Sequence, residues 1–163
     1  MKTESVSPKI LVSACLVGCR SRYDAALPEV INKRLSRWME GGLVLPFCPE
    51  TAGGLAVPRP PAEISRRAAS GGKVFTCSGE DVTENFVTGA KNTVTAVEFF
   101  GIQAAVLKDG SPSCGLTWIY DGFFRNKRVP GQGIAAALLA ANKIALFNEN
   151  NLALLEDWVA KEI

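Results

Sequence analysis

Short apolar runs alternate along this chain with longer stretches in which apolar residues recur every three or four positions. The short runs are typical of buried strands, and they lie at residues 9–14, 43–47, 102–107 and 144–147. The longer stretches predict helices after Pro28, between Asp81 and Gly101, over 134–142, and after Asn150. This alternation predicts an α/β fold, a single three-layer α/β/α domain over residues 1–163 with a mostly parallel, Rossmann-like sheet.

Residues with special backbone preferences mark the expected ends of these helices. Pro28 suits the first turn of a helix whose apolar face begins at Val30, and Gly41-Gly42 is expected to end that helix. Asp81 and Asn150 are predicted to cap the helices that follow them. The first three predicted helices thus each lie between one central strand and the next, as a parallel sheet requires, and the fourth follows the last strand.

Two segments lie outside the repeating pattern. After Pro49, a stretch rich in glycine and proline predicts a long ordered loop, which is a kind of segment that often carries function. Beyond that loop, residues 73–77 predict a small strand. Residues 118–120 and 123–124 predict a hairpin that turns at Asp121-Gly122.

The composition is that of one ordinary globular domain of 163 residues, of which 47% are hydrophobic and 21% charged. A formal net charge of +2 is too balanced for a nucleic-acid surface, so we expect no stable nucleic-acid partner. The sequence has no run of 18 apolar residues, and its polar start over residues 1–8 lacks an export signal. We therefore expect a cytoplasmic protein without membrane contact, as a monomer or weak homodimer.

The chain contains five cysteines and no histidine. Without histidine, the commonest general base and the Ser/His and Cys/His nucleophile pairs are excluded. In a cytoplasmic protein the cysteines are expected to be reduced, and their odd number argues against a closed set of disulfides. A metal site in this chain would be rich in thiolate, which favours an iron-sulfur cluster or zinc.

Three of the cysteines, Cys15, Cys48 and Cys114, each follow an apolar run closely. Because the carboxyl ends of parallel strands lie at one edge of a sheet, the three thiols are expected to converge there on one soft metal centre. The plain alternative is that each is a small buried hydrophobic residue. The spacing of Cys19 and the strand context of Cys77 favour structural or surface thiols instead.

Polar residues near these cysteines are candidates for catalysis. Glu50 lies two residues after Cys48, where partial burial and the charge of a cluster favour general acid or base work. Ser111 and Ser113 precede Cys114 and offer hydroxyls for substrate orientation or proton transfer. The alternative is that Glu50 is an exposed loop carboxylate and that the serines are ordinary turn residues.

Other polar residues in these loops are candidates for substrate binding. Arg22, Tyr23 and Asp24 place a cation, a ring and a carboxylate in the first loop, as a nucleobase or phosphate site requires. Lys108 follows the third apolar run and adds a second cation. The alternative for these residues is a solvated turn.

Together, the motifs of the chain resemble those of the bacterial thiouracil desulfurases, a family formerly of unknown function. The resemblance covers about residues 9–151 and is carried by an ordered set of motifs: Ser13-Ala14-Cys15-Leu16, Arg22-Tyr23-Asp24, Cys48-Pro49-Glu50, Gly53-Gly54-Leu55, Pro58-Arg59 and Ser111-Pro112-Ser113-Cys114-Gly115. It implies an oxygen-sensitive 4Fe-4S cluster with three protein ligands, Cys15, Cys48 and Cys114, and one open iron. Ala25 departs from the family, which often has glycine at this place.

The resemblance also implies a reaction, the non-redox removal of sulfur from a thiolated uracil such as 2-thiouracil or 4-thiouridine monophosphate. The open iron would take the thiocarbonyl sulfur, Glu50 would activate water, and Ser111 or Ser113 would orient the substrate and transfer a proton. The implied contacts to this small-molecule substrate are Arg22, Tyr23, Asp24 and Lys108. The alternative that the residues leave open is a cluster-free or zinc-stabilised nucleotide-binding or regulatory module.

Overall fold

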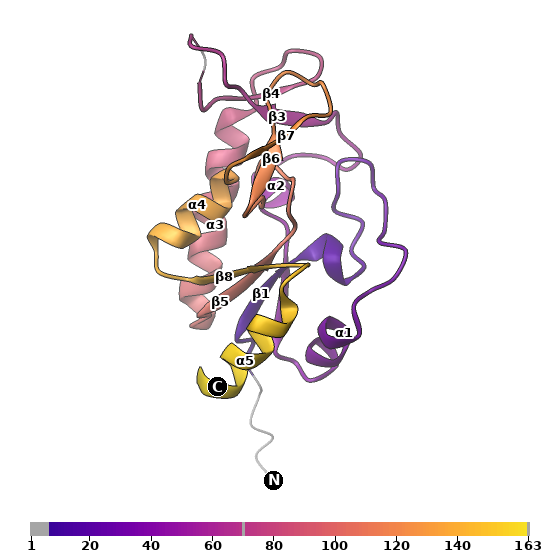
Figure 1. Ribbon diagram of the computed structural model, residues 1–163, viewed down its shortest axis with the longest axis vertical. Coiled ribbons are helices and arrows are strands. Elements are labelled where there is room, and N and C mark those ends of the chain that lie inside the picture. The colour runs from indigo at the N-terminus through magenta and orange to yellow at the C-terminus, as the bar shows by residue number, and fades with distance from the viewer. Residues whose placement is uncertain (1–6, 70, 163) are drawn as a thin grey trace.

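Four short parallel strands form the sheet at the centre of the molecule (Figure 1). The computed structural model describes residues 7–69 and 71–162. The strands of the sheet are β1 (Ile10–Ser13), β2 (Val44–Phe47), β5 (Ala104–Leu107) and β8 (Ala145–Asn148). Their order in space is β2-β1-β5-β8, so the chain leaves β1 for β2 and then crosses back to β5. Such a change of direction opens a crevice beyond the carboxyl ends of the strands on either side of it.

Helices cover both faces of this sheet, which confirms the predicted three-layer α/β/α fold. On one face, α1 (Lys33–Glu40) and α5 (Leu152–Glu162) pack on side chains of alternate strand positions such as Ile10 and Val12. On the other face, α3 (Thr83–Phe100) and α4 (Ile134–Ala141) pack around Leu11 and its neighbours. All three of these β1 side chains are fully buried, because a parallel sheet between two helical layers has no solvated face.

Two antiparallel ribbons lie beyond the carboxyl ends of the central strands, at the top of Figure 1. One pairs β3 (Ala62–Ile64) with β4 (Val74–Thr76), and the other pairs β6 (Trp118–Tyr120) with β7 (Arg128–Pro130). The first ribbon packs on α3 through a separate apolar cluster that contains Val74 and Phe86. The ribbons therefore add walls above the edge of the sheet where the cysteines were expected.

The expected start of the first helix at Pro28 is wrong. α1 begins at Lys33, and Asn32 caps it, since its side-chain oxygen accepts the backbone N–H of Arg34. Val30, expected on the apolar face, lies outside the helix and is 81% exposed. The side chain of a cap residue accepts a hydrogen bond from one of the free N–H groups at a helix start. A proline is compatible with the first turn of a helix but satisfies none of these groups.

The segment after Cys48 begins with a helical turn, α2 (Pro49–Ala52), before it continues as the expected long loop. Two glycines allow this turn to approach α3 closely. A Cβ atom on Gly53 would lie 2.0 Å from the carbonyl oxygen of Asn85, and one on Gly89 would lie 2.0 Å from that of Pro49. This contact fixes the turn that follows Cys48 against the longest helix of the fold.

The predicted caps of the later helices lie close to the observed helix starts. α3 begins at Thr83, and Asp81 accepts the backbone N–H of Thr83 from one position before the N-cap residue. As predicted, Gly101 ends this helix in the left-handed conformation, with a φ of 63°. α5 begins at Leu152, so the residue before it is Asn151 and not the predicted Asn150.

The partner of strand 118–120 was predicted wrongly. β6 pairs with β7, and residues 121–127 form a wide loop in place of a turn at Asp121-Gly122. The carboxylate of Glu63 in β3 accepts the backbone N–H groups of Gly122 and Phe124, and Glu63 is buried. A contact from a distant strand thus sets the shape of this loop.

Candidate active site

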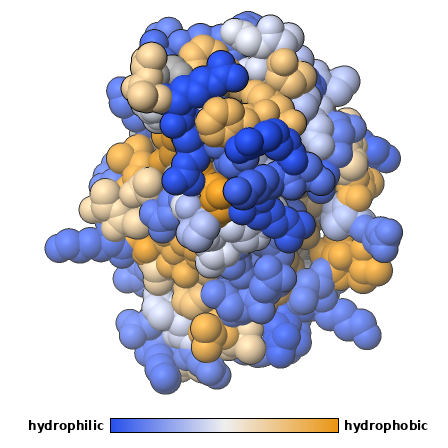
Figure 2. Space-filling model, turned by 45° about the horizontal axis from the view of Figure 1, so that its top comes forward, coloured by the Kyte–Doolittle hydropathy of each residue, from blue (hydrophilic) through white to orange (hydrophobic). Residues whose placement is uncertain are grey.

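A cavity of about 590 Å³ lies beyond the carboxyl ends of β1, β2 and β5. Its walls come from the loops that follow these strands and from both antiparallel ribbons. Figure 2, which brings the top of the molecule forward, shows deep blue hydrophilic side chains gathered around apolar ones on this face. The lining includes the cysteines Cys15, Cys48, Cys77 and Cys114 and the aromatic residues Tyr23, Phe47, Trp118, Tyr120 and Phe124.

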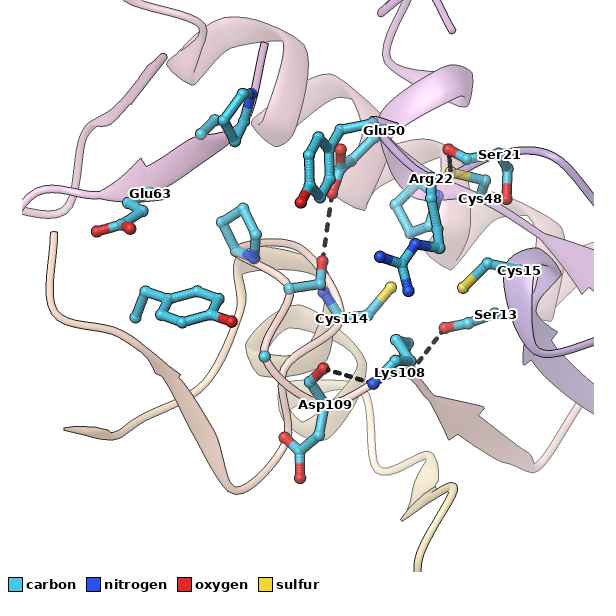
Figure 3. A pocket seen from close by; sticks show the side chains of 18 of the residues that line it. Ser13, Cys15, Ser21, Arg22, Cys48, Glu50, Glu63, Lys108, Asp109 and Cys114 are labelled. Carbon is cyan, nitrogen blue, oxygen red and sulfur yellow. Dashed lines mark hydrogen bonds between the residues drawn. The ribbon is translucent and has the colours of Figure 1, made fainter. Parts of the chain in front are cut away.

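Three thiols reach this cavity from three different strands, as the sequence predicted. Cys15 lies in a 3-10 turn, η1 (Ala14–Val17), that continues β1 directly. Cys48 follows β2, and its Sγ donates to the carbonyl oxygen of Ser21 at 3.7 Å. Cys114 lies in the loop after β5 and is only 5% exposed. Figure 3 shows the three sulfur atoms around one space, with the guanidinium of Arg22 beside them.

The burial of two of these thiols opposes their ionisation. Burial raises the pKa of Cys15 to about 11, and negative charge on Cys48 adds to the rise. Burial also raises the pKa of Cys114 far above its usual range, against the effect of a hydrogen bond with Ser13. In the absence of a metal, both thiols therefore keep their protons at neutral pH. A metal centre that bound here would have to displace these protons.

The spacing of the thiols does not suit a single metal ion. Within residues 7–69 and 71–162, no three side chains of Cys, Asp, Glu or His approach closely enough to bind one ion. Zinc holds every thiolate ligand at about 2.3 Å, so its ligands must meet around one point. An iron-sulfur cluster binds each thiolate through a different iron and therefore accepts wider spacing. Cys15, Cys48 and Cys114, which line one cavity from three strand ends, are the residues that could hold a centre of the second kind.

Glu50 lies in the first turn of α2 and faces the same cavity. Arg59 donates two hydrogen bonds to its Oε2 atom, from Nε at 2.9 Å and from Nη2 at 2.6 Å. Arg59 is itself fixed, because it also donates to the carbonyl oxygens of Ser21 and Ala56. The side chains of Glu50 and Arg59 are only 14% and 8% exposed. Oε2 is therefore fully engaged, and Oε1 is the oxygen that faces other partners.

Ser111 connects Glu50 to the loop of Cys114. Its hydroxyl lies 3.2 Å from Glu50 Oε1 and accepts the backbone N–H groups of Ser113 and Cys114, each at 3.0 Å. A hydroxyl has one hydrogen and two lone pairs, so with both lone pairs occupied its hydrogen is donated to Glu50. The predicted catalytic residues Glu50 and Ser111 are thus joined directly.

The structure places Ser113 away from the cavity. Its side chain is fully buried, and its Oγ has no hydrogen-bond partner among the described residues. Its carbonyl oxygen accepts the backbone N–H groups of Ala135 and Ala136 at the start of α4. Ser113 therefore attaches the Cys114 loop to α4, and it does not line the cavity with Ser111.

The structure brings two of the three residues predicted in the first loop to the cavity. Arg22 and Tyr23 line the cavity, whereas Asp24 lies behind Arg22. Asp24 accepts two hydrogen bonds from Arg22, at 3.0 and 2.9 Å, and these bonds lower the pKa of Asp24. Ala25 has a φ of 55°, in the left-handed region that glycine adopts most easily. The loop thus keeps a glycine-like shape at the position that departs from the family.

Lys108 leaves the end of β5 and also lines the cavity. Its backbone N–H donates to Ser13 Oγ, and its Nζ pairs with Glu149 Oε1 at 2.5 Å. The other oxygen of Glu149 accepts the backbone N–H of Asp109. Glu149, which follows β8, was not predicted as part of the site, because only the sheet brings residues 108 and 149 together.

Asp109 organises the loop that carries Cys114. Its carboxylate accepts the backbone N–H groups of Leu116, Thr117 and Trp118 and the side chain of Asn148. Burial opposes its charge, but the hydrogen bonds from Thr117 and the neighbouring backbone lower the pKa of Asp109 overall. Sequence reasoning missed this residue, although an aspartate directly before a glycine in a cysteine loop is a usable turn signal.

The two remaining cysteines are exposed, in agreement with their interpretation as surface thiols. Cys77 also lies in the lining of the cavity, on the side of β4, whereas Cys19 does not.

The fold and the site define a class of protein: a small α/β domain whose parallel sheet gathers three thiols, a fixed carboxylate and several aromatic rings around one crevice. Residues 10–151 match the 2-thiouracil desulfurase family, and the chain belongs to that family. This finding confirms the resemblance seen in the motifs.

Two proteins illustrate the relationship. The chain is 37% identical over 148 residues to the uncharacterized protein YbbK of Bacillus subtilis (strain 168), a match that covers 88% of this chain and 97% of YbbK. It is 42% identical to a solved structure of the 4Fe-4S-dependent thiouracil desulfidase TudS, which it matches with a TM-score of 0.87. That match covers 94% of this chain and 98% of the TudS chain.

The searched part of the chain, residues 7–69 and 71–162, contains no helix that is both long and apolar enough to span a membrane. Residues 1–6 hold most of the polar start on which the expectation of no export signal rests, and they lie outside the described part.

Proposed function

We propose that this protein removes sulfur from a thiolated uracil with the help of a 4Fe-4S cluster. Membership of the 2-thiouracil desulfurase family and the likeness to TudS support this function. The observation that carries the proposal is the arrangement of one cavity, in which Cys15, Cys48 and Cys114 lie beside Glu50 and Ser111. A general acid or base next to three thiols is what a cluster-dependent hydrolysis requires.

In this proposal the cluster is bound by Cys15, Cys48 and Cys114. The three thiols suit such a cluster, because they line one cavity from three different strand ends, and among the described residues they do not form a site for a single ion. The bound cluster would supply one iron without a protein ligand, which acts as a Lewis acid toward the sulfur of the substrate. Arg22 lies beside the sulfur atoms, and its positive charge lowers the pKa of Cys15 against the effect of burial.

The reaction is an exchange of oxygen for sulfur without change of oxidation state. The carbon–sulfur double bond of the thiolated ring is replaced by a carbon–oxygen double bond, the oxygen comes from water, and the sulfur leaves as sulfide. Glu50 accepts a proton from the attacking water. Arg59 holds Oε2, so the carboxylate presents Oε1 toward the water, and Ser111 fixes the direction of that atom.

Other residues of the cavity bind and orient the substrate. Tyr23 offers a ring for stacking on the pyrimidine, while Arg22 and Lys108 offer hydrogen-bond donors to its oxygen atoms. Asp24 acts through Arg22, whose guanidinium it holds in place. Ser113 keeps only a structural part in this scheme, so the hydroxyl that assists catalysis is that of Ser111.

The zinc-stabilised nucleotide-binding or regulatory module loses support from the spacing of the thiols, which does not suit one ion. For the proposed enzyme, the ligand remains a small thiolated base or nucleotide. A cytoplasmic location and a monomeric or weakly dimeric state remain predictions from the sequence.

Replacement of Glu50 by glutamine tests the proposed chemistry. The anaerobically reconstituted wild type is expected to release sulfide from 2-thiouracil or 4-thiouracil, measured colorimetrically together with the loss of thiocarbonyl absorbance. Glu50→Gln is expected to lose turnover by a factor of about 100 or more while it keeps its iron, because the amide cannot accept the proton. Glu156→Gln is the matched control, because this carboxylate of α5 pairs with Arg34 and does not line the cavity. Wild-type turnover in Glu50→Gln would refute the assignment of the base.

A further inference from the structure

Among the described residues, three serines line the cavity, and each makes a different contact. Ser111 donates its hydroxyl hydrogen to Glu50. Ser21 meets the site through its backbone, since its carbonyl oxygen accepts a hydrogen bond from Cys48 Sγ. The third is Ser13, the last residue of β1, and the proposed reaction gives its hydroxyl no part.

Ser13 lies where the two inner strands of the sheet end. The ladder between β1 and β5 ends with the pair Val12 and Val106. Beyond this pair, Oγ of Ser13 accepts the backbone N–H of Lys108 at 3.0 Å, so a side chain continues the ladder. Ser13 is only 2% exposed, which shields this hydroxyl from competing water. The sheet itself therefore fixes the place of the hydroxyl.

The same hydroxyl reaches one of the three thiols of the candidate cluster site. A hydrogen bond joins the side chains of Ser13 and Cys114. Figure 3 shows the Ser13 hydroxyl on the side of the cavity where the sulfur atoms of Cys15 and Cys114 lie.

The direction of this hydrogen bond follows from the chemistry of the two groups. The backbone N–H of Lys108 occupies one lone pair of Ser13 Oγ, so the hydrogen of the hydroxyl stays available for sulfur. The form of cysteine that binds a metal is the thiolate, which has no hydrogen to donate. Once Cys114 binds a metal, the Ser13 hydroxyl must therefore be the donor.

We propose that Ser13 is a positioning residue whose hydroxyl donates a hydrogen bond to the metal-bound thiolate of Cys114 and so lowers the electron density of the cluster. This inference rests on the proposed function, because it needs a cluster bound by Cys114. Hydrogen bonds to the sulfur atoms contribute to the reduction potential of an iron-sulfur cluster. They raise it, because they stabilise most strongly the form that carries one more electron. An iron with less electron density is also a stronger Lewis acid toward the sulfur of the substrate.

The test compares the reduction potential of the reconstituted cluster in the wild type, in Ser13→Ala and in Ser21→Ala. Ser13→Ala is expected to lower the ratio of reduced to oxidised cluster at a fixed potential by a factor of about 3 to 10, because a hydrogen bond to sulfur is lost. Ser21→Ala removes a hydroxyl from the same lining but keeps the carbonyl contact to Cys48, so its potential is expected to match that of the wild type. An unchanged potential in Ser13→Ala, or an equal shift in both variants, would overturn the proposal.

A third variant distinguishes the hydrogen bond to sulfur from a merely structural effect. Ser13→Thr keeps a hydroxyl that can accept from Lys108 and donate to Cys114, so its potential is expected to stay close to that of the wild type. The potential is a property of the loaded chains alone, so a variant that binds less iron still gives a result. A potential in Ser13→Thr as low as that in Ser13→Ala would contradict the role of the hydroxyl.

A second measurement separates this inference from the proposed function. Electron-nuclear double resonance of the reduced cluster, in H2O and in D2O, detects exchangeable protons close to it. One such signal is expected to disappear in Ser13→Ala and to remain in Ser21→Ala and Ser13→Thr. Neither measurement uses a substrate, so wild-type signals in Ser13→Ala would contradict this inference even if desulfuration is fast. A wild type that binds the cluster and releases no sulfide would contradict only the proposed function, and one that binds no cluster would contradict both.

Discussion

The side chain of Cys15 shows how one residue links stability to metal binding. In the folded chain, burial raises its pKa from an ordinary value of 9.0 to about 11. Above pH 9 the unfolded chain therefore releases this proton while the folded chain retains it. The contribution of Cys15 to the free energy of unfolding is therefore complete below pH 9. It decreases above pH 9 and is lost as the pH rises through 11.

We therefore predict that the cluster-free protein loses stability between pH 9 and pH 11. A rise of two pKa units corresponds to about 2–3 kcal/mol from Cys15. Urea unfolding under anaerobic reducing conditions at pH 8, 9 and 10 measures the effect, and Cys15→Ala is expected to show a shallower decline. If Cys15→Ala declined as steeply as the wild type, the burial argument would be wrong.

The residues that sequence reasoning placed in the site are those that follow strands. Cys15, Cys48 and Cys114 converge because the carboxyl edge of a parallel sheet is a general rule of α/β folds. The partners of these residues could not be predicted in the same way. Arg59 reaches Glu50 across a loop, and Glu149 reaches Lys108 from 41 positions along the chain. Such contacts depend on how loops fold back, which periodicity does not encode.

At the scale of elements, the turn α2 depends on its contact with α3. Gly89 lies in the middle of α3, where alanine would normally stabilise a helix by about 1 kcal/mol. Here a Cβ atom would lie 2.0 Å from the carbonyl oxygen of Pro49, the residue after Cys48. The two effects have opposite signs, and the steric effect is larger because the clash is with backbone.

Gly89→Ala is therefore predicted to destabilise the protein by about 1–3 kcal/mol and to displace the turn that carries Glu50. Chemical denaturation measures the first effect, and the iron content after reconstitution reports the second, because Cys48 precedes the same turn. Thr95→Ala, at an exposed position of α3, is the control and is expected to change stability by less than about 0.5 kcal/mol. Unchanged or increased stability of Gly89→Ala would contradict the close contact.

The elements themselves were predicted best where burial is complete. The inner strands β1 and β5 are fully buried between the two helical layers, so they appear in the sequence as unbroken apolar runs, and the half-buried edge strands β2 and β8 are still apolar enough to be recognised. The start of α1 was missed because the prediction relied on Pro28 alone, whereas the hydrogen bond that Asn32 accepts from the backbone N–H of Arg34 sets the start of the helix. The pairing of β6 was missed because Glu63, in another ribbon, shapes the loop between the hairpin strands.

At the scale of the whole molecule, the elements that form the hydrophobic core are separate from the loops and ribbons that line the cavity. The two helical layers bury the sheet, while the cavity lies beyond its carboxyl edge beneath two small ribbons (Figures 1 and 3). Each cysteine of the proposed cluster site comes from a different strand end, so the site exists only when the sheet is complete. From the ribbon β6–β7, the rings of Trp118 and Tyr120 and the single cation Arg128 line the same cavity as the thiols.

The central claim is that these three thiols hold a cluster in this cavity. The most direct measurement is the amount of iron and acid-labile sulfide per chain after anaerobic reconstitution and removal of unbound metal. About four of each are predicted for the wild type and for Cys19→Ser, with loss of both in Cys15→Ser, Cys48→Ser and Cys114→Ser. A wild type that binds no iron or a single zinc, or a full cluster in any of the last three variants, would contradict the claim.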